Sequence, residues 1–140
     1  MMSIAGAGSV RCLAASTVPV AISVRAKIEG QTLHIFGKAN VPNGAWIIYA
    51  AYRTAPPRAR ATGYAQVRDD RFAAHLNVAN WLPGPIKVDV NFQVLLPTRK
   101  QPAIVTTRFG KLGERMTGSD VVKGGGTFRA AVASTTVVKP

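Results

Sequence analysis

The segment Val41–Val94 decides the fold, because apolar, β-prone runs alternate in it with turns. It begins V-P-N-G-A-W-I-I-Y-A-A-Y-R at Val41–Arg53. After a break rich in Pro and Arg it continues with G-Y-A-Q-V-R-D-D-R-F-A-A-H-L at Gly63–Leu76, and after N-W-L-P-G-P it ends in I-K-V-D-V-N-F-Q-V at Ile86–Val94. β-branched and aromatic residues favour strands, whereas Pro, Asn and Gly favour turns. The segment therefore predicts strand-forming regions joined by turns.

The clearest half-buried strand is predicted over Ile86–Leu96, where apolar and polar residues alternate. Successive side chains of a strand point to opposite faces, so one face collects the apolar residues. The run Ala45–Arg53 is apolar on both faces and predicts a central strand. In the predicted strand Ile86–Leu96, the residues expected to face inward are Ile86, Val88, Val90, Phe92 and Val94.

Further short strands are expected along most of the chain. Seven or eight short strands at this spacing predict an all-β, antiparallel sandwich or barrel. We divide the chain into an N-terminal arm (1–17), a β-sandwich domain (18–122) and a C-terminal tail (123–140) that follows the Gly-rich hinge Gly124–Gly126. The additional strands are expected at Val18–Ala26, Thr32–Ala39, Ala61–Arg68, Phe72–Val78, Ala103–Phe109 and Thr127–Val138.

The N-terminal segment Met1–Ala26 is rich in small and apolar residues. Its apolar stretch Leu13–Val24 is too short and too polar for a spanning helix. No positive charge precedes Ile4–Val10, which makes it a poor signal peptide. We interpret it as an arm that lies on a partner, with an uncleaved export signal or a membrane anchor as the alternatives.

The net charge of +12 is the strongest signal in the composition, with 18 basic against 6 acidic residues. A domain with this charge repels itself, so an acidic partner is expected. Nucleic acid, anionic lipid, an acidic polysaccharide or an acidic protein surface would each satisfy this requirement. The alternative is a broadly solvated basic surface, because the basic residues are spread along the chain.

Two groups of basic residues are the predicted partner contacts. They lie in the loop that follows the central strand and in the turn-rich region near residues 99–115. No signature of a nucleic-acid-binding fold accompanies them, so the sequence argues against nucleic acid as the partner. The predicted contacts are Arg53, Arg58, Arg60, Arg99, Lys100, Arg108, Lys111 and Arg115.

The sequence shows no pattern typical of catalysis. The single cysteine, Cys12, excludes an intrachain disulfide and a Cys-based zinc site. His34 and His75 have no Cys, Asp or Glu at ligand spacing. Gly124–Gly126 lacks the Lys-Ser/Thr of a phosphate loop, and no serine lies in a G-x-S-x-G elbow. We therefore expect a non-enzymatic protein without a cofactor, a metal or a small-molecule ligand.

The turns in their order resemble an immunoglobulin-like β-sandwich domain of uncharacterised bacterial envelope and secreted proteins. The resemblance covers roughly Val24–Val122 and implies a single antiparallel sandwich of about seven strands, here with extended N- and C-terminal arms. It implies no catalytic residues. The motifs that carry it are N-V-P-N-G-A at Asn40–Ala45, V-R-D-D-R-F at Val67–Phe72, L-P-G-P at Leu82–Pro85, Q-P-A-I-V at Gln101–Val105 and G-K-L-G-E-R-M-T-G at Gly110–Gly118.

The sequence leaves two functional hypotheses. The first is a structural or accessory subunit that docks, through its basic surface and terminal arms, onto the acidic protein subunits of a larger assembly. This assembly would be a virion shell or a membrane or envelope complex, so the protein would be associated with a virion or with the bacterial cell envelope. The alternative is an exported binding module for an acidic glycan or envelope polymer.

Overall fold

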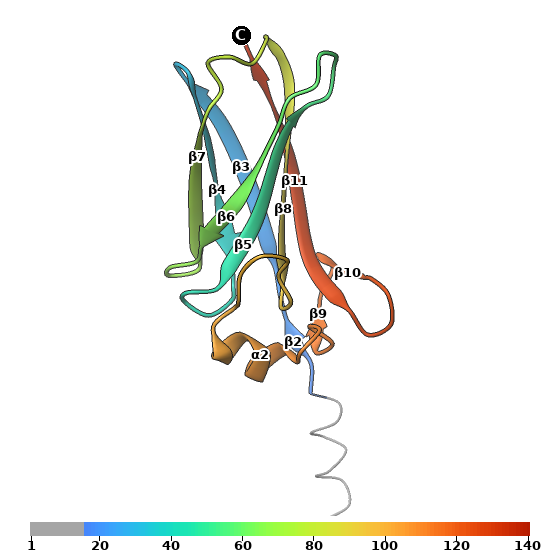
Figure 1. The fold of residues 1–140 in the computed structure, drawn as a ribbon. Helices are drawn as coiled ribbons and strands as arrows, with labels where there is room; N and C mark the ends of the chain where they lie inside the picture. The colour runs from blue at the N-terminus through green and yellow to red at the C-terminus, as the bar shows by residue number, and fades with distance from the viewer. Residues whose placement is uncertain (1–15) are drawn as a thin grey trace, which may run out of the picture.

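The computed structural model describes residues 16–140, which form mostly antiparallel β-sheet (Figure 1). The first sheet has five strands, in the spatial order β10 (Val121–Lys123), β11 (Arg129–Lys139), β8 (Gly84–Gln93), β5 (Trp46–Arg53) and β6 (Arg60–Gln66). The second has three strands, in the order β3 (Ile22–Glu29), β4 (Thr32–Ala39) and β7 (Arg71–Asn77). A short parallel pair, β2 (Val18–Pro19) with β9 (Met116–Thr117), and the helix α2 (Ala103–Phe109) complete the elements of the described residues.

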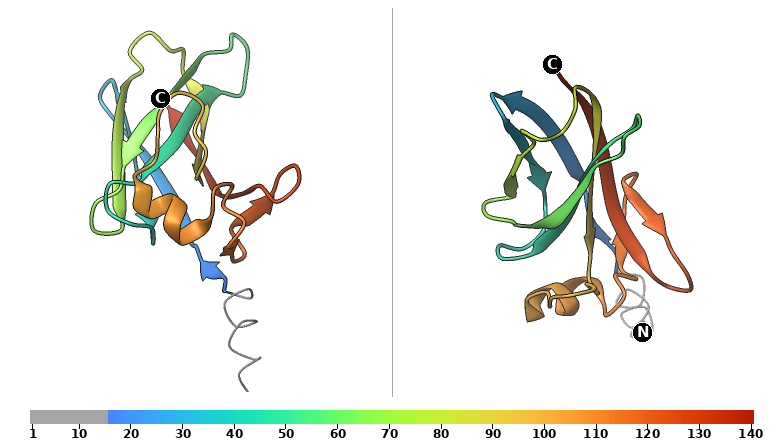
Figure 2. Two further views of the ribbon diagram at one scale, coloured as in Figure 1. Left: turned by 60° about the horizontal axis from the view of Figure 1, so that its bottom comes forward. Right: turned by 45° about the horizontal axis from the view of Figure 1, so that its top comes forward.

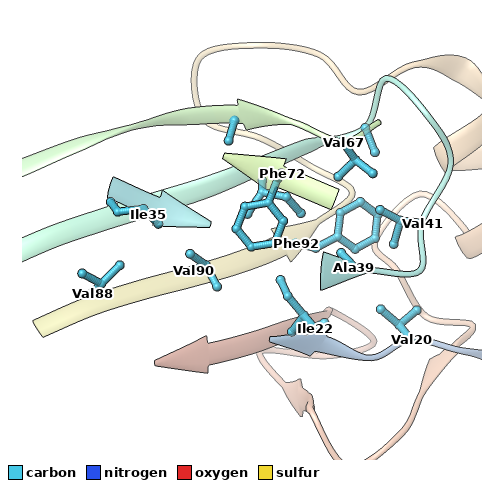
Figure 3. Packing of buried hydrophobic residues seen from close by; sticks show 14 of the residues in the cluster. Val20, Ile22, Ile35, Ala39, Val41, Val67, Phe72, Val88, Val90 and Phe92 are labelled. Carbon is cyan, nitrogen blue, oxygen red and sulfur yellow. The ribbon is translucent and has the colours of Figure 1, made fainter. Parts of the chain in front are cut away.

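The hydrophobic core lies between the two sheets and receives side chains from both (Figure 3). The alternation expected in β8 is confirmed, because Ile86, Val88, Val90 and Phe92 are all buried. From the opposite sheet, alternate residues of β4 such as Ile35 are buried in the same cluster. Full burial of a side chain of this size stabilises a fold by roughly 1.5–3 kcal/mol. The period-2 pattern is therefore the main determinant of the fold.

The hairpin β6–β7 joins the two sheets. Its turn residues Asp69 and Asp70 both have positive φ angles, 51° and 63°. Asp tolerates this conformation, which matches the strand twist in a two-residue hairpin. Arg68 and Arg71 close the turn with backbone hydrogen bonds of 2.8 and 2.9 Å. The turn expected in V-R-D-D-R-F at Val67–Phe72 is confirmed, and it leaves Arg68 and Arg71 side by side.

The strand predicted at Ala103–Phe109 is wrong, because these residues form the helix α2. The β-branched composition favoured a strand, but the buried residues are Val105 and Phe109, four positions apart. That spacing places both on one helical face. Pro102 precedes the helix and Gly110, with φ of 91°, follows it. Burial of one helical face and the two end signals outweigh the intrinsic strand preference.

The C-terminal tail predicted for 123–140 is also wrong, because Arg129–Lys139 form the long strand β11 between β10 and β8. The predicted strand in this region is thus part of the sheet. Gly124–Gly126 lie in the hairpin loop between β10 and β11, closed by a 2.9 Å bond from the Gly124 amide to the Phe128 carbonyl. Ala130 and Ala131 of β11 are buried, and Ala133 and Val137 are partly buried against the core. This burial keeps the segment in the sheet and removes it as a docking arm.

The predicted N-terminal arm (1–17) lies almost entirely outside the described residues.

Within residues 16–140, no helix has the length and apolar character needed to cross a membrane. In the same part of the chain, no group of three or more His, Cys, Asp or Glu side chains is arranged to hold a metal ion. Figure 2 shows α2 and the β10–β11 hairpin at one end of the sheets, with the last residue at the other end.

Gln101 attaches the loop before α2 to the five-stranded sheet. It is 9% exposed, and its side chain accepts a hydrogen bond from the Trp46 amide at 2.8 Å. It also donates to the carbonyl oxygens of Trp46 and Gln93, both at 2.9 Å. We expect Gln101→Leu to lower the free energy of unfolding by about 2 kcal/mol, because buried backbone groups lose their partners. Urea unfolding measures this change; the matched control Gln31→Leu alters an exposed residue, and an equal loss in both variants would contradict the assignment.

Candidate binding groove

The structure separates the two predicted groups of partner contacts. The loop carrying Arg58 and Arg60 and the region of α2 lie at opposite ends of the sheets (Figure 1). Arg58 and Arg60 are both exposed, and the Arg60 guanidinium lies 5.8 Å from the centre of the Tyr52 ring. They do not form one surface with the second predicted group.

Arg53 is not available as a partner contact, contrary to the prediction. It is only 5% exposed, and its guanidinium donates to carbonyl oxygens on both sides of it. Nε donates to Leu82 at 3.0 Å, and the terminal nitrogens donate to Pro83 at 2.7 Å and to Ala55 at 2.6 Å, with a further bond to Pro57. Arg53 therefore joins two loops. The basic character of this residue serves the fold.

The second predicted group also has partly structural contacts. The Arg99 guanidinium lies over the rings of Trp46 and Tyr64, 4.2 and 4.7 Å from their centres. Arg115 donates to the Thr107 carbonyl at 2.9 Å, near the end of α2. These contacts attach the connecting loops to the sheet and to the helix. The remaining members, Lys100, Arg108 and Lys111, are exposed.

A third group of basic residues, which the sequence did not single out, surrounds a groove on the outer face of the three-stranded sheet. The groove is open to solvent and has a volume of about 900 Å³. Side chains from β3, β4, β7 and the end of β6 line it. We call it the basic groove; its lining consists of Ser23, Arg25, Phe36, Gly37, Lys38, Gln66, Arg68, Arg71, Phe72 and Ala73.

Strand register brings the four basic side chains of the groove together. Lys38 of β4 pairs with Arg71 of β7, and Arg71 pairs with Arg68 across the hairpin. Arg25 of β3 pairs with Phe36, one step along the same face. Directly paired residues in antiparallel strands have Cβ atoms about 5 Å apart. The register therefore places four like charges over neighbouring positions, although they come from distant parts of the sequence.

The cations of the basic groove have no acidic partner within the described residues. Among residues 16–140, salt bridges occur only at Lys27, His34 and Lys87, none of which lines the groove. Arg68 donates to the Gln66 side chain at 3.1 Å, which leaves its charge uncompensated. Like charges directly opposite each other in a sheet are destabilising. An anion bound in the groove would offset this repulsion.

A smaller hollow of about 400 Å³ borders the groove at Ser23 and Lys38 and contains two carboxylates. One of them, Asp120, accepts a hydrogen bond from the Ile22 amide at 3.0 Å. The other, Asp70, belongs to the β6–β7 turn. Both carboxylates line this smaller hollow, and neither lines the groove.

Phe36 gives the centre of the groove an apolar contact. Phe36 is 37% exposed. Of its two neighbours on the strand, Ile35 is buried in the core and Gly37 lies against the Ser23 backbone of β3. Phe36 lies between Arg25 on β3 and Ala73 on β7. Exposed aromatic residues beside arginine are typical of residues that contribute strongly to protein interfaces.

The lining of the groove has the chemistry to bind an anion. Its lining contains no Asp, Glu, His or Cys residue. General acid–base catalysis needs a group that transfers a proton near the working pH, and arginine does not do so. The arrangement can hold an anionic group through several charge-assisted hydrogen bonds.

Comparison of the chain with models of known protein families, with curated proteins and with solved structures gives no match. The geometry of the groove is therefore the basis for inferring what the protein binds.

Proposed function

We propose that this protein is a non-enzymatic docking subunit that binds an acidic partner protein in the basic groove. The observation that carries the proposal is the convergence of four unpaired basic side chains around an exposed aromatic residue. The net charge of +12 supports it, because a charged surface of one sign accelerates and orients association with a surface of the opposite sign.

The composition of the groove favours a protein partner. Three of its four cations are arginines, Arg25, Arg68 and Arg71, and the exposed Phe36 pairs directly with Arg25. Protein interfaces are enriched in arginine and aromatic residues and depleted in lysine. The planar guanidinium also binds a carboxylate through two parallel hydrogen bonds. An acidic segment with an apolar side chain for Phe36 is the partner chemistry that fits.

In this proposal the groove, and not a C-terminal arm, is the surface that docks onto the partner. Because β11 is a strand of the five-stranded sheet, the C-terminal residues 129–139 already have a partner within the chain. The outer face of β3, β4 and β7 has none among the described residues. Docking through a sheet face also explains why the basic residues are distributed over several strands.

We further propose that the fold is an immunoglobulin-like sandwich. The seven long strands, taken in chain order as A to G, divide into a sheet A-B-E and a sheet G-F-C-D. The constant-type immunoglobulin domain has A, B, E and D in one sheet and C, F and G in the other. Only the fourth strand, here β6 (Arg60–Gln66), changes sheets between the two arrangements. This strand order supports the fold suggested by the turn motifs.

Charge reversal in the groove tests the docking proposal. We expect the double variant Arg25→Glu, Arg71→Glu to bind deca-aspartate, a model acidic peptide, at least about tenfold more weakly than the unaltered protein, because attraction becomes repulsion. Fluorescence anisotropy with labelled peptide at fixed salt measures the affinity. The matched control Arg58→Glu, Lys100→Glu makes the same change in net charge at two exposed, sequence-predicted contacts and should retain most of the binding.

The outcomes separate the alternatives. If the control variant loses as much affinity as the groove variant, net charge controls binding and the groove is not the site. Tighter binding of polygalacturonate than of deca-aspartate, lost in the groove variant, would contradict the protein partner and support a binding module for acidic glycans. No measurable binding of either polymer would overturn the proposal.

A further inference from the structure

Both histidines of the chain lie on the same sheet face as the basic groove and contact each other. His34 of β4 pairs directly with His75 of β7. Their Nδ1 atoms are 2.9 Å apart, and the rings meet edge to face with centres 4.7 Å apart. This pair is one step along the sheet from the Phe36–Ala73 pair, which lines the groove. The groove and the histidine pair therefore form one continuous surface.

The contacts are compatible with one arrangement of the ring protons. Nε2 of His34 lies 3.2 Å from a carboxylate oxygen of Glu29, and an ionised carboxylate only accepts hydrogen bonds, so this nitrogen is assigned the proton. In a neutral imidazole one nitrogen donates and the other accepts, so Nδ1 of neutral His34 accepts the hydrogen bond from Nδ1 of His75. Nε2 of His75 then has a free lone pair. A proton added there converts the link between the rings into a charge-assisted hydrogen bond and breaks no contact.

The charged groups that face the pair come from β3. Lys27 pairs directly with His34, with Arg25 one step closer to the groove and Glu29 one step further away. Glu29 contributes a negative charge beside the pair, whereas Lys27 and Arg25 contribute positive charges. Lys27 is itself 3.5 Å from Glu29. Over residues 32–37 of β4 and 72–77 of β7, the two histidines are the only ionisable side chains.

We propose that proton uptake by the His34–His75 pair tightens the binding of an acidic partner in the basic groove. The proposal rests on the function proposed above. A proton on the pair adds positive charge to the face that contacts the partner, and the partner's carboxylates in turn stabilise the proton. The coupling is reciprocal, so a bound acidic partner increases the affinity of the pair for a proton by the same factor.

The composition makes this coupling measurable. Histidine is the side chain that ordinarily changes charge between about pH 5 and 8. The chain has two, and both belong to the pair. Deca-aspartate remains ionised over the same range, because the aspartate carboxyl ordinarily has a pKa of about 3.9. A change in affinity between pH 7.5 and 5.5 therefore reports on the pair.

The test compares the affinity for labelled deca-aspartate at pH 7.5 and at pH 5.5, at one ionic strength. We expect the unaltered protein to bind about threefold more tightly at pH 5.5, as one added charge near a solvent-exposed site implies. The double variant His34→Gln, His75→Gln should show the same affinity at both values. The control Lys38→Gln removes a charge of the basic groove that does not belong to the pair, so it should weaken binding at both values and retain the threefold ratio.

Three results would overturn the inference, and they have different consequences for the proposed docking site. An affinity of the unaltered protein that does not rise at pH 5.5 removes the coupling but keeps the groove as the docking site. An equal rise in the double histidine variant assigns the effect to another group. Absence of binding at both pH values removes the proposed function and the inference with it. Thermal unfolding of each variant confirms that all are folded.

Discussion

Replacement of Arg53 by methionine is expected to lower the free energy of unfolding by about 3–4 kcal/mol, the largest loss for a single substitution among those considered for this protein. Methionine keeps most of the apolar stem but removes all donors. The carbonyl oxygens of Ala55, Leu82 and Pro83 then lose their charged partner. Hydrogen bonds to charged groups contribute about 1.5–3 kcal/mol each, and water compensates part of the loss in loops of mixed exposure.

The position of Arg53 explains why the effect is large. It is the last residue of β5, and its side chain connects the loop that leaves β5 with the loop that enters β8. Both loops contain prolines, which lack a backbone donor, so the guanidinium supplies donors that the backbone does not. Without it, the ends of two central strands lose their common attachment.

Urea unfolding followed by tryptophan fluorescence measures the change. The matched control is Arg58→Met, which removes an exposed arginine from the same loop and should change stability by less than about 0.5 kcal/mol. The free energy of unfolding of Arg53→Lys should lie between those of Arg53→Met and Arg58→Met, because the lysine ammonium retains the charge but cannot reach all of the same carbonyl oxygens. Equal stability of Arg53→Met and Arg58→Met would refute the structural role.

The sequence was sufficient to predict the strands whose pattern is local. Alternation in β8 and the turn at Asp69–Asp70 depend only on neighbouring residues, and both are confirmed. It was insufficient for α2, where the decisive feature is the burial of Val105 and Phe109. β-branched residues favour a strand in isolation, and only the surrounding core shows which face must be buried. Local preference was overridden by tertiary contacts.

The basic groove depends on strand register, and the sequence alone does not contain it. Period-2 alternation places Arg25 and Lys38 opposite the buried residues of their own strands, which the sequence does show. Lys38 lies beside Arg71 only because β4 pairs with β7. These residues are distant along the chain, and no local pattern identifies the pairing. Proximity in sequence groups Arg53 with Arg58 and Arg60, but the structure buries Arg53.

The second large effect is expected at Gly37, where the backbones of β3 and β4 approach closely. A Cβ atom at this position would lie 2.0 Å from the Ser23 carbonyl oxygen and 2.7 Å from Cζ of Phe72. The Phe72 ring can rotate away at some cost, but the Ser23 oxygen belongs to the neighbouring strand. We expect Gly37→Ala to lower the free energy of unfolding by about 3 kcal/mol, because a core that is already packed must move to admit the methyl group.

The same substitution tests whether the groove depends on this close approach. Ser23, Gly37 and Phe72 all line the groove, so separating β3 from β4 would move Arg25 away from Lys38. We therefore expect Gly37→Ala to weaken deca-aspartate binding while the protein is still folded. The control is Gly125→Ala, where an added Cβ meets nothing within 4 Å and stability should remain within about 0.5 kcal/mol. If Gly37→Ala matched this control in both stability and affinity, neither the packing of β3 against β4 nor the shape of the groove would depend on the glycine.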